Sequence, residues 1–153
     1  MIEENITKRK YYTTQMKSKY QTQKSKEDQK EKVFDIRERT YLFSQRVLDI
    51  VAMLPKDNDL ESIRKQLIKS GTSIGANTEE GDGSITRRDF INKIAIARKE
   101  AKETRFWLRL ISGRYIDSKL IEDDIEESQE IIRVLSAIIV STKTGNKQNE
   151  TAK

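Results

Sequence analysis

The sequence predicts an all-α protein, an antiparallel up-and-down four-helix bundle. One Pro and six Gly among 153 residues leave few turn signals, and the many Glu, Lys, Arg, Leu and Ile residues favour helices over strands. Four amphipathic segments follow one another with short connections, which is typical of antiparallel neighbours in a bundle. The mass of 17.8 kDa has room for one domain with tails.

The composition divides the chain into three parts. Residues 1–33 contain eight hydrophobic residues and nine Lys or Arg, which predicts a basic, polar, flexible leader. Residues 34–142 contain 44 hydrophobic residues in 109 and are expected to form the bundle. Residues 143–153 have one alanine as their only apolar residue and are expected to form a disordered tail.

The first two helices are bounded by recognisable signals. The first is predicted from about Asp35 to Leu54, where Pro55 ends it. Its apolar residues are spaced by threes and fours: Phe43, Val47, Ile50, Val51 and Leu54. Asp57 or Asp59 can cap the second helix, which is expected to continue to about Glu80 before Gly81 and Gly83 break it. Its apolar stripe is Leu60, Ile63, Leu67 and Ile74, with the small residues Ser70 and Gly71 permitting close packing.

The third helix is the longest expected and has the most regular apolar seam. Thr86 and Asp89 resemble a capping box, and Gly113 follows the end of the helix near Ser112. Its seam alternates spacings of four and three through Phe90, Ile94, Ala97, Ala101, Thr104, Leu108 and Ile111. The fourth helix starts at Asp117 or Ser118 and is expected to stop at Gly145. Its seam is Ile121, Ile125, Ser128, Ile132, Leu135 and Ile139.

The last two helices carry apolar residues away from these seams. On the third helix they are Ile96, Trp107 and Leu110, and on the fourth they are Ile131, Val134 and Ile138. Such residues either widen the core or contact another subunit. We expect them to form an oligomer interface, with the wider core as the alternative.

The charges of these two helices have opposite signs. Residues 87–114 hold nine basic and three acidic residues, whereas residues 117–133 hold seven acidic and two basic residues. Arg98, Lys102, Arg105 and Arg109 follow one another at one-turn spacing, with Lys99 beside them. Such a row can neutralise successive phosphates of a nucleic acid. The alternative is a solvated face, or one that pairs with the acidic helix. Tyr11, Tyr12 and Tyr20 among the leader's lysines suit flexible RNA, although most tails of this composition are merely disordered.

The composition excludes much familiar catalytic chemistry. The chain has no Cys and no His, so thiolate and imidazole chemistry are absent. We therefore expect no enzyme, no cofactor and no metal. One acidic pattern is weighed against this: Glu79, Glu80, Glu100 and Glu103 are similar to the paired carboxylates of all-α nucleotide pyrophosphohydrolases that bind magnesium. The acidic run from Glu122 to Glu130 is expected to be a solvated face. No apolar run is long enough for a membrane span, and we expect a cytoplasmic protein.

Three ordered blocks carry a family resemblance. They are Phe34 to Thr40, Lys69 to Asn77 with Glu79, and Ala97 to Glu103 with Trp107 to Leu110. They resemble the bacterial four-helix-bundle proteins encoded in intervening sequences of 23S ribosomal RNA genes. A looser resemblance links the chain to the accessory variability proteins of diversity-generating retroelements, which bind nucleic acid together with a reverse transcriptase.

The resemblance covers about residues 34–142 and implies a homopentamer with a basic surface. Arg98, Lys99, Lys102, Arg105 and Arg109 occupy the family's basic helix, and Trp107 and Leu110 its aromatic and leucine positions. The 33-residue leader departs from the typical family member, so its role is not inherited. We therefore expect a non-enzymatic oligomer that binds RNA through the basic surface of the third helix. The alternative is a protein-interaction scaffold, such as a reverse-transcriptase accessory subunit, without nucleic-acid affinity of its own.

Overall fold

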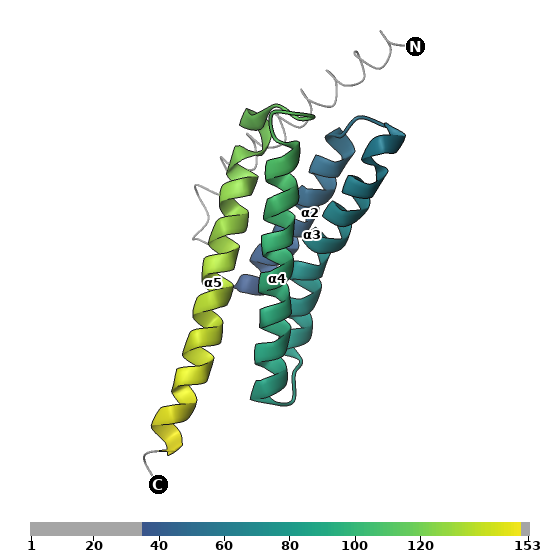
Figure 1. Cartoon of the computed structure of the whole chain (residues 1–153). Coiled ribbons are helices and arrows are strands. Elements are labelled where there is room, and N and C mark those ends of the chain that lie inside the picture. Colours follow the sequence, from purple (N-terminus) through teal and green to yellow (C-terminus); the bar gives the residue numbers. More distant parts are fainter. Residues whose placement is uncertain (1–34, 151–153) are drawn as a thin grey trace.

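Four long helices form the bundle in the described part of the chain, as predicted (Figure 1). The computed structural model describes residues 35–150, with side chains described as far as residue 145. The helices are α2 (Ile36–Met53), α3 (Glu61–Asp82), α4 (Arg87–Ile111) and α5 (Ser118–Glu150), and a short 3₁₀ turn, η1 (Asn58–Leu60), leads into α3. The predicted leader and residues 151–153 of the predicted tail lie outside the described residues.

The helix starts follow the predicted capping residues. The Asp35 side chain accepts a hydrogen bond of 2.9 Å from the Arg37 N–H at the start of α2. Asp57 caps η1 rather than α3 itself. The Thr86 side chain accepts from the Asp89 N–H at 3.1 Å, which confirms Thr86 as the N-cap of α4, and the Thr86 hydroxyl donates to the Asp89 carboxylate in place of the backbone N–H of a full capping box. Gly113 has a φ of 73°, the left-handed conformation that favours glycine just after a helix.

Two predicted helix breaks are wrong. Gly81 lies inside α3 and is buried against α4. A Cβ at this position would lie 3.3 Å from the Ile94 side chain. Glycine here permits close packing and does not end the helix. Gly145 also lies inside a helix, since α5 continues to Glu150. A single glycine costs a helix only about 1 kcal/mol, so it does not have to stop one.

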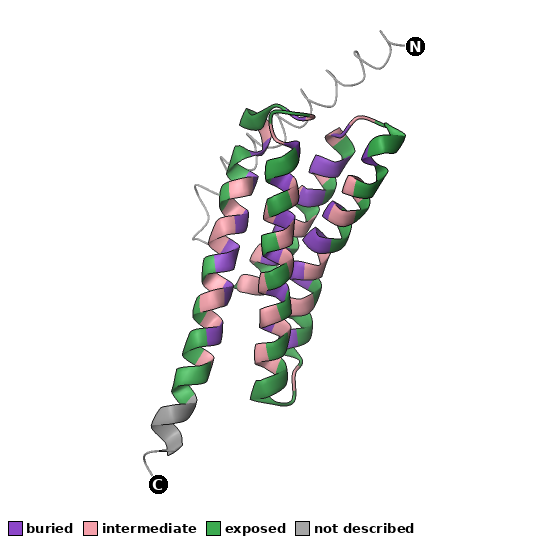
Figure 2. Cartoon of the chain, viewed as in Figure 1, coloured by how far each residue is buried: buried purple, intermediate pink, exposed green. Residues whose placement is uncertain are grey.

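The core lies along the axis of the bundle and consists mainly of the predicted seams (Figure 2). The predicted apolar residues of α2 are all buried, as are Leu60, Leu67 and Ile74 of the next segment. In α4 the seam from Ile94 to Ile111 is buried, and Phe90 is half-buried. Each helix packs against the next along the chain, and the contact between α2 and α5 is the least extensive of the neighbouring pairs. Within residues 35–150, no helix is both long and apolar enough to cross a membrane.

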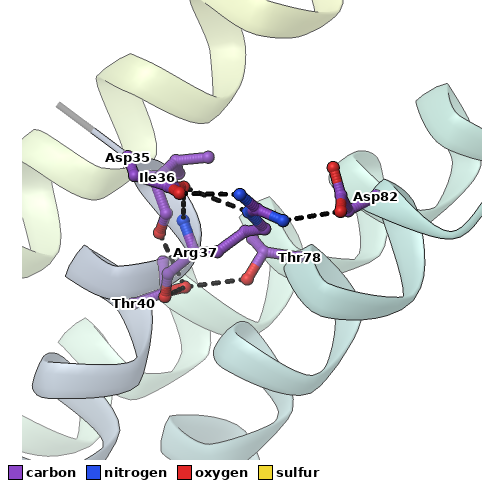
Figure 3. Close-up of polar contacts among 6 residues, drawn as sticks. All are labelled: Asp35, Ile36, Arg37, Thr40, Thr78 and Asp82. Atoms are coloured by element: carbon purple, nitrogen blue, oxygen red, sulfur yellow. Dashed lines mark hydrogen bonds and ion pairs between the residues drawn. The ribbon is translucent and has the colours of Figure 1, made fainter.

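Polar contacts join the start of α2 to the end of α3 (Figure 3). The Arg37 guanidinium bonds Asp35 at 2.8 Å and Asp82 of α3 at 2.6 Å. Arg37 lowers the pKa of Asp35, chiefly through the hydrogen bond from its side chain. One turn further along, the buried hydroxyls of Thr40 and Thr78 share a hydrogen bond of 2.8 Å. The first sequence block of the family resemblance therefore has a structural role here.

Candidate nucleic-acid interface

Four of the five predicted nucleic-acid-binding residues lie on one side of α4, about 100° around the helix from the buried seam, and Lys99 lies further from the seam. Lys99, Lys102 and Arg109 are exposed, and Arg98 and Arg105 are half-buried. The α-helical rise of about 1.5 Å per residue spreads them over roughly 16 Å of the helix axis. The structure thus places these cations in one row, as the spacing predicted.

This row has no ionic partner in the described part of the molecule. None of the five side chains makes an ion pair or a side-chain hydrogen bond with another residue in the range 35–145. The Nε atom of Arg105 is buried and has no hydrogen-bond partner there. Burying an unpaired charged donor is costly for a fold. The row is therefore not neutralised by neighbouring carboxylates among the described residues, which contradicts the pairing with the acidic helix and leaves the solvated face as the alternative.

The acidic residues of α5 that face the bundle bind α2 instead. The Arg39 guanidinium bonds Glu127 through Nε at 2.7 Å and Nη2 at 2.9 Å. Arg46 donates from Nε to the Asp124 carboxylate. Asp124 is fully buried, so the prediction that residues 122–130 form a solvated face is wrong at this position. Burial raises the pKa of the Asp124 carboxyl, and the hydrogen bond and charge of Arg46 act in the opposite direction.

The predicted interface residues fall into three environments. Ile96 and Leu110 are 43% and 41% exposed on α4. Trp107 and Ile138 are partly buried and pack against the core, and Val134 is half-buried. Ile131 is fully buried in the chain's own core, so for this residue the wider core applies and the interface assignment is wrong. Its side chain points between the helices because it lies one turn from Ser128 and Leu135, which are both buried.

The comparisons with known proteins identify the family. The model of the family described as 23S rRNA-intervening sequence protein matches residues 32–137. The chain belongs to this family. A solved structure of a protein of unknown function, from the S23 ribosomal protein family of Bacteroides thetaiotaomicron VPI-5482, is 38% identical in sequence. The match covers 68% of this chain and 97% of that one, with a TM-score of 0.63. Comparison with curated proteins gives no match.

One exposed aromatic residue beside the basic row was not among the site residues predicted from the sequence. Phe106 is 56% exposed on α4, between Lys102 and Arg109. Its ring lies edge-on to the Trp107 ring, with 5.0 Å between the ring centroids and 75° between the ring planes. Sequence spacing could have found it, because residue 106 is four residues after Lys102 and three before Arg109.

The carboxylates considered for a magnesium site have separate environments. Glu80 binds Lys93, and Glu103 accepts a long hydrogen bond of 3.4 Å from the Trp107 indole N–H. Glu79 is exposed and Glu100 is half-buried. Among the described residues of this family member, no group of three or more Asp and Glu side chains could hold a metal ion.

Proposed function

We propose that this 23S rRNA-intervening sequence protein binds RNA through the basic face of α4, defined as Arg98, Lys99, Lys102, Arg105 and Arg109. The observation that carries the proposal is that these five cations share one side of a helix and have no ionic partner in the described residues. Cations at one-turn intervals suit a chain of phosphates, whose neutralisation releases counterions and provides affinity. The family's description says where such proteins are encoded and names no ligand, so RNA is tested first on the expectation from the sequence.

Recognition by this face is expected to depend on charge and only weakly on base sequence. Lysine and arginine side chains in a row reach phosphate oxygens, which carry no sequence information. Affinity should therefore fall steeply with salt. For a single strand, log K should decrease by about 0.7 per neutralised phosphate for each tenfold increase in salt concentration.

The proposal includes assembly of several chains and no catalytic role. Ile96 and Leu110 are exposed apolar side chains on α4, and Trp107, Val134 and Ile138 are half-buried. Exposed apolar side chains are common in subunit contacts. A ring of copies, a pentamer by the family resemblance, would repeat the basic face and raise the avidity for a long polyanion. Light scattering that shows a monomer at micromolar concentration would contradict the assembly.

The test is charge reversal with a matched control. The three exposed cations are changed together (Lys99→Glu, Lys102→Glu, Arg109→Glu), and binding to a labelled RNA strand is titrated at several salt concentrations. The control changes three exposed lysines elsewhere by the same charge (Lys56→Glu, Lys69→Glu, Lys119→Glu). The half-buried Arg98 and Arg105 stay unchanged, because reversing a half-buried charge can unfold the helix.

We expect the α4 variant to bind RNA more weakly and to lower the salt slope by about 2, which corresponds to three phosphate contacts at 0.7 each. The control should keep both the slope and most of the affinity. Equal losses in both variants would show that net charge alone attracts the RNA, and the α4 face would then have no special role. Circular dichroism checks that both variants remain helical.

A protein-interaction scaffold is the second candidate. The exposed apolar residues beside the basic face, Ile96 and Leu110, favour it, since such residues are common in protein contacts. A reverse transcriptase is one partner of this kind. This candidate predicts no retained nucleic acid after purification without nuclease, so the ratio of absorbance at 260 and 280 nm separates the two candidates.

A further inference from the structure

An exposed aromatic ring lies within the unpaired cations of α4. Phe106 is 56% exposed, the most exposed aromatic residue in the range 35–145. Lys102 lies four residues before it and Arg109 three residues after it, so each is one helical turn away. A large apolar ring in solvent does not contribute to the core of the chain that carries it.

The helical geometry places this ring at the centre of the exposed side. At 100° per residue, Lys99, Lys102 and Arg109 lie within about 60° of Phe106 around the helix axis. The buried residues Ala97, Thr104 and Leu108 lie on the opposite side. The ring and the three exposed cations therefore face solvent together.

Trp107 limits the motion of the ring. The two rings meet edge to face at 5.0 Å, and the partly buried Trp107 is itself packed against the core. A phenylalanine has only two side-chain torsions, and such a contact restricts them further. Little conformational entropy is then lost when a flat ligand group stacks on the open part of the ring.

We propose that Phe106 stacks an unpaired base while Lys102 and Arg109 bind the phosphates on either side, so that the ligand is single-stranded RNA. This inference rests on the proposed function and specifies its substrate class. The bases of a duplex are stacked on each other and offer no free face, whereas those of a single strand can stack on an aromatic side chain. A phosphate row alone would bind either form.

The charges around the ring disfavour a two-fold symmetric contact with a second copy of the chain through this side. In a two-fold symmetric contact through this side, Lys99, Lys102 and Arg109 of one copy would oppose the same cations of the other. Like charges brought together in this way destabilise an interface. An RNA strand instead supplies both the negative charge and the flat surface.

The experiment compares three probes and four variants of the full chain. The probes are an RNA single strand of about 12 nucleotides, an RNA duplex of the same length, and heparin, which is a polyanion without bases. The variants are Phe106→Ala, Phe106→Leu, which keeps apolar volume without a ring, Phe106→Trp, which keeps a ring, and Tyr41→Ala. Tyr41 is the matched control, because it is 53% exposed on α2 and has no basic row beside it.

We expect Phe106→Ala and Phe106→Leu to weaken single-strand binding by about 5- to 150-fold, the range for loss of one stacked base. Binding of the duplex and of heparin should change less than about two-fold, and the salt slope should stay the same because no cation is removed. Phe106→Trp should retain single-strand affinity. Tyr41→Ala should bind all three probes as the unchanged protein does.

Three results would overturn the inference. Equal losses for all three probes would mean that Phe106 only supports the shape of the basic face. A changed sedimentation coefficient with unchanged RNA affinity would assign the ring to contact with a second copy. Retention by Phe106→Leu of full single-strand affinity would show that apolar volume, and not stacking, matters. If the unchanged protein binds none of the probes, the proposed function itself is wrong. That outcome is distinct from the three results above, which concern only the role of Phe106.

Discussion

Substitution of Gly71 by alanine tests the packing of α2 against α3. A Cβ at Gly71 would lie 2.6 Å from Cγ1, 2.9 Å from Cβ and 3.0 Å from Cγ2 of Val47. Carbon atoms in contact prefer about 3.5 to 4.0 Å, so the new methyl group would have to move by about 1 Å. Val47 is fully buried and β-branched, and its side chain has one strongly preferred rotamer in a helix. The two helices must therefore separate.

The expected cost follows from two opposing effects. Overpacking of this kind costs about 1 to 3 kcal/mol, and three close contacts with a rigid partner place Gly71→Ala at the upper end. Alanine gains about 1 kcal/mol over glycine in a helix interior. We expect a net loss of about 2 kcal/mol, which for a domain of this size lowers the melting temperature by about 8 °C.

Urea denaturation of Gly71→Ala, Val47→Ala and the double variant measures the contact directly. In the double variant Cγ1 and Cγ2 of Val47 are gone and the added methyl group occupies part of the space they leave. The double variant should then be more stable than the sum of the single changes predicts, with a coupling of about 1 kcal/mol or more. Additive losses, or a Gly71→Ala variant as stable as the unchanged protein, would refute the close approach of the two helices.

Three further predictions concern α5 and the ends of the bundle. Gly145→Ala should raise helicity and stability by up to about 1 kcal/mol in a thermal melt, because no atom lies within 4 Å of the added methyl group. Asp35→Ala should lower the melting temperature at neutral pH, and the difference should vanish in acid. Arg37 lowers the pKa of Asp35 in the folded state, so its contribution is present above pH about 4 and is lost as the pH falls through the folded-state pKa. Asp124→Asn should show the reverse trend. Burial raises the pKa of Asp124, so the stability of the unchanged protein relative to this variant should fall as the pH rises from about 4 towards the folded-state value, measured by urea titration at each pH.

The apolar periodicity was sufficient to predict the fold. Most seam positions are buried as expected, because a helix that buries one stripe must repeat its apolar residues every three or four positions. The capping residues Asp35 and Thr86 also follow from local chemistry, since their side-chain oxygens satisfy N–H groups that a helix start leaves open. The helix ends predicted at Gly81 and Gly145 were wrong. Gly81 is needed for the close approach of α4, and α5 continues past Gly145, and neither fact can be read from local sequence signals.

The polar contacts between helices could not be predicted from spacing. Asp124 has the same sequence setting as its exposed acidic neighbours, and only the packing of α2 beside α5 buries it against Arg46. Arg64 is similar: its guanidinium donates at 3.3 Å to the carbonyls of Val51 and Leu54 at the end of α2. Such bonds satisfy the carbonyls that a helix end leaves open. They depend on which helices become neighbours, and a single sequence does not state this.

The arginines of α2 and α4 differ in whether they have a carboxylate partner. On α2, Arg37, Arg39 and Arg46 each bind a carboxylate, and the last two join α2 to α5 where contact between helices is least extensive. On α4, Arg105 is half-buried as well, yet its Nε has no partner among the described residues. A half-buried guanidinium without a partner lowers stability, so the fold does not account for it. A phosphate bound to the solvent-facing part of the guanidinium would pair its charge as the carboxylates do for the α2 arginines, whereas the buried Nε would gain an acceptor only if the side chain moved.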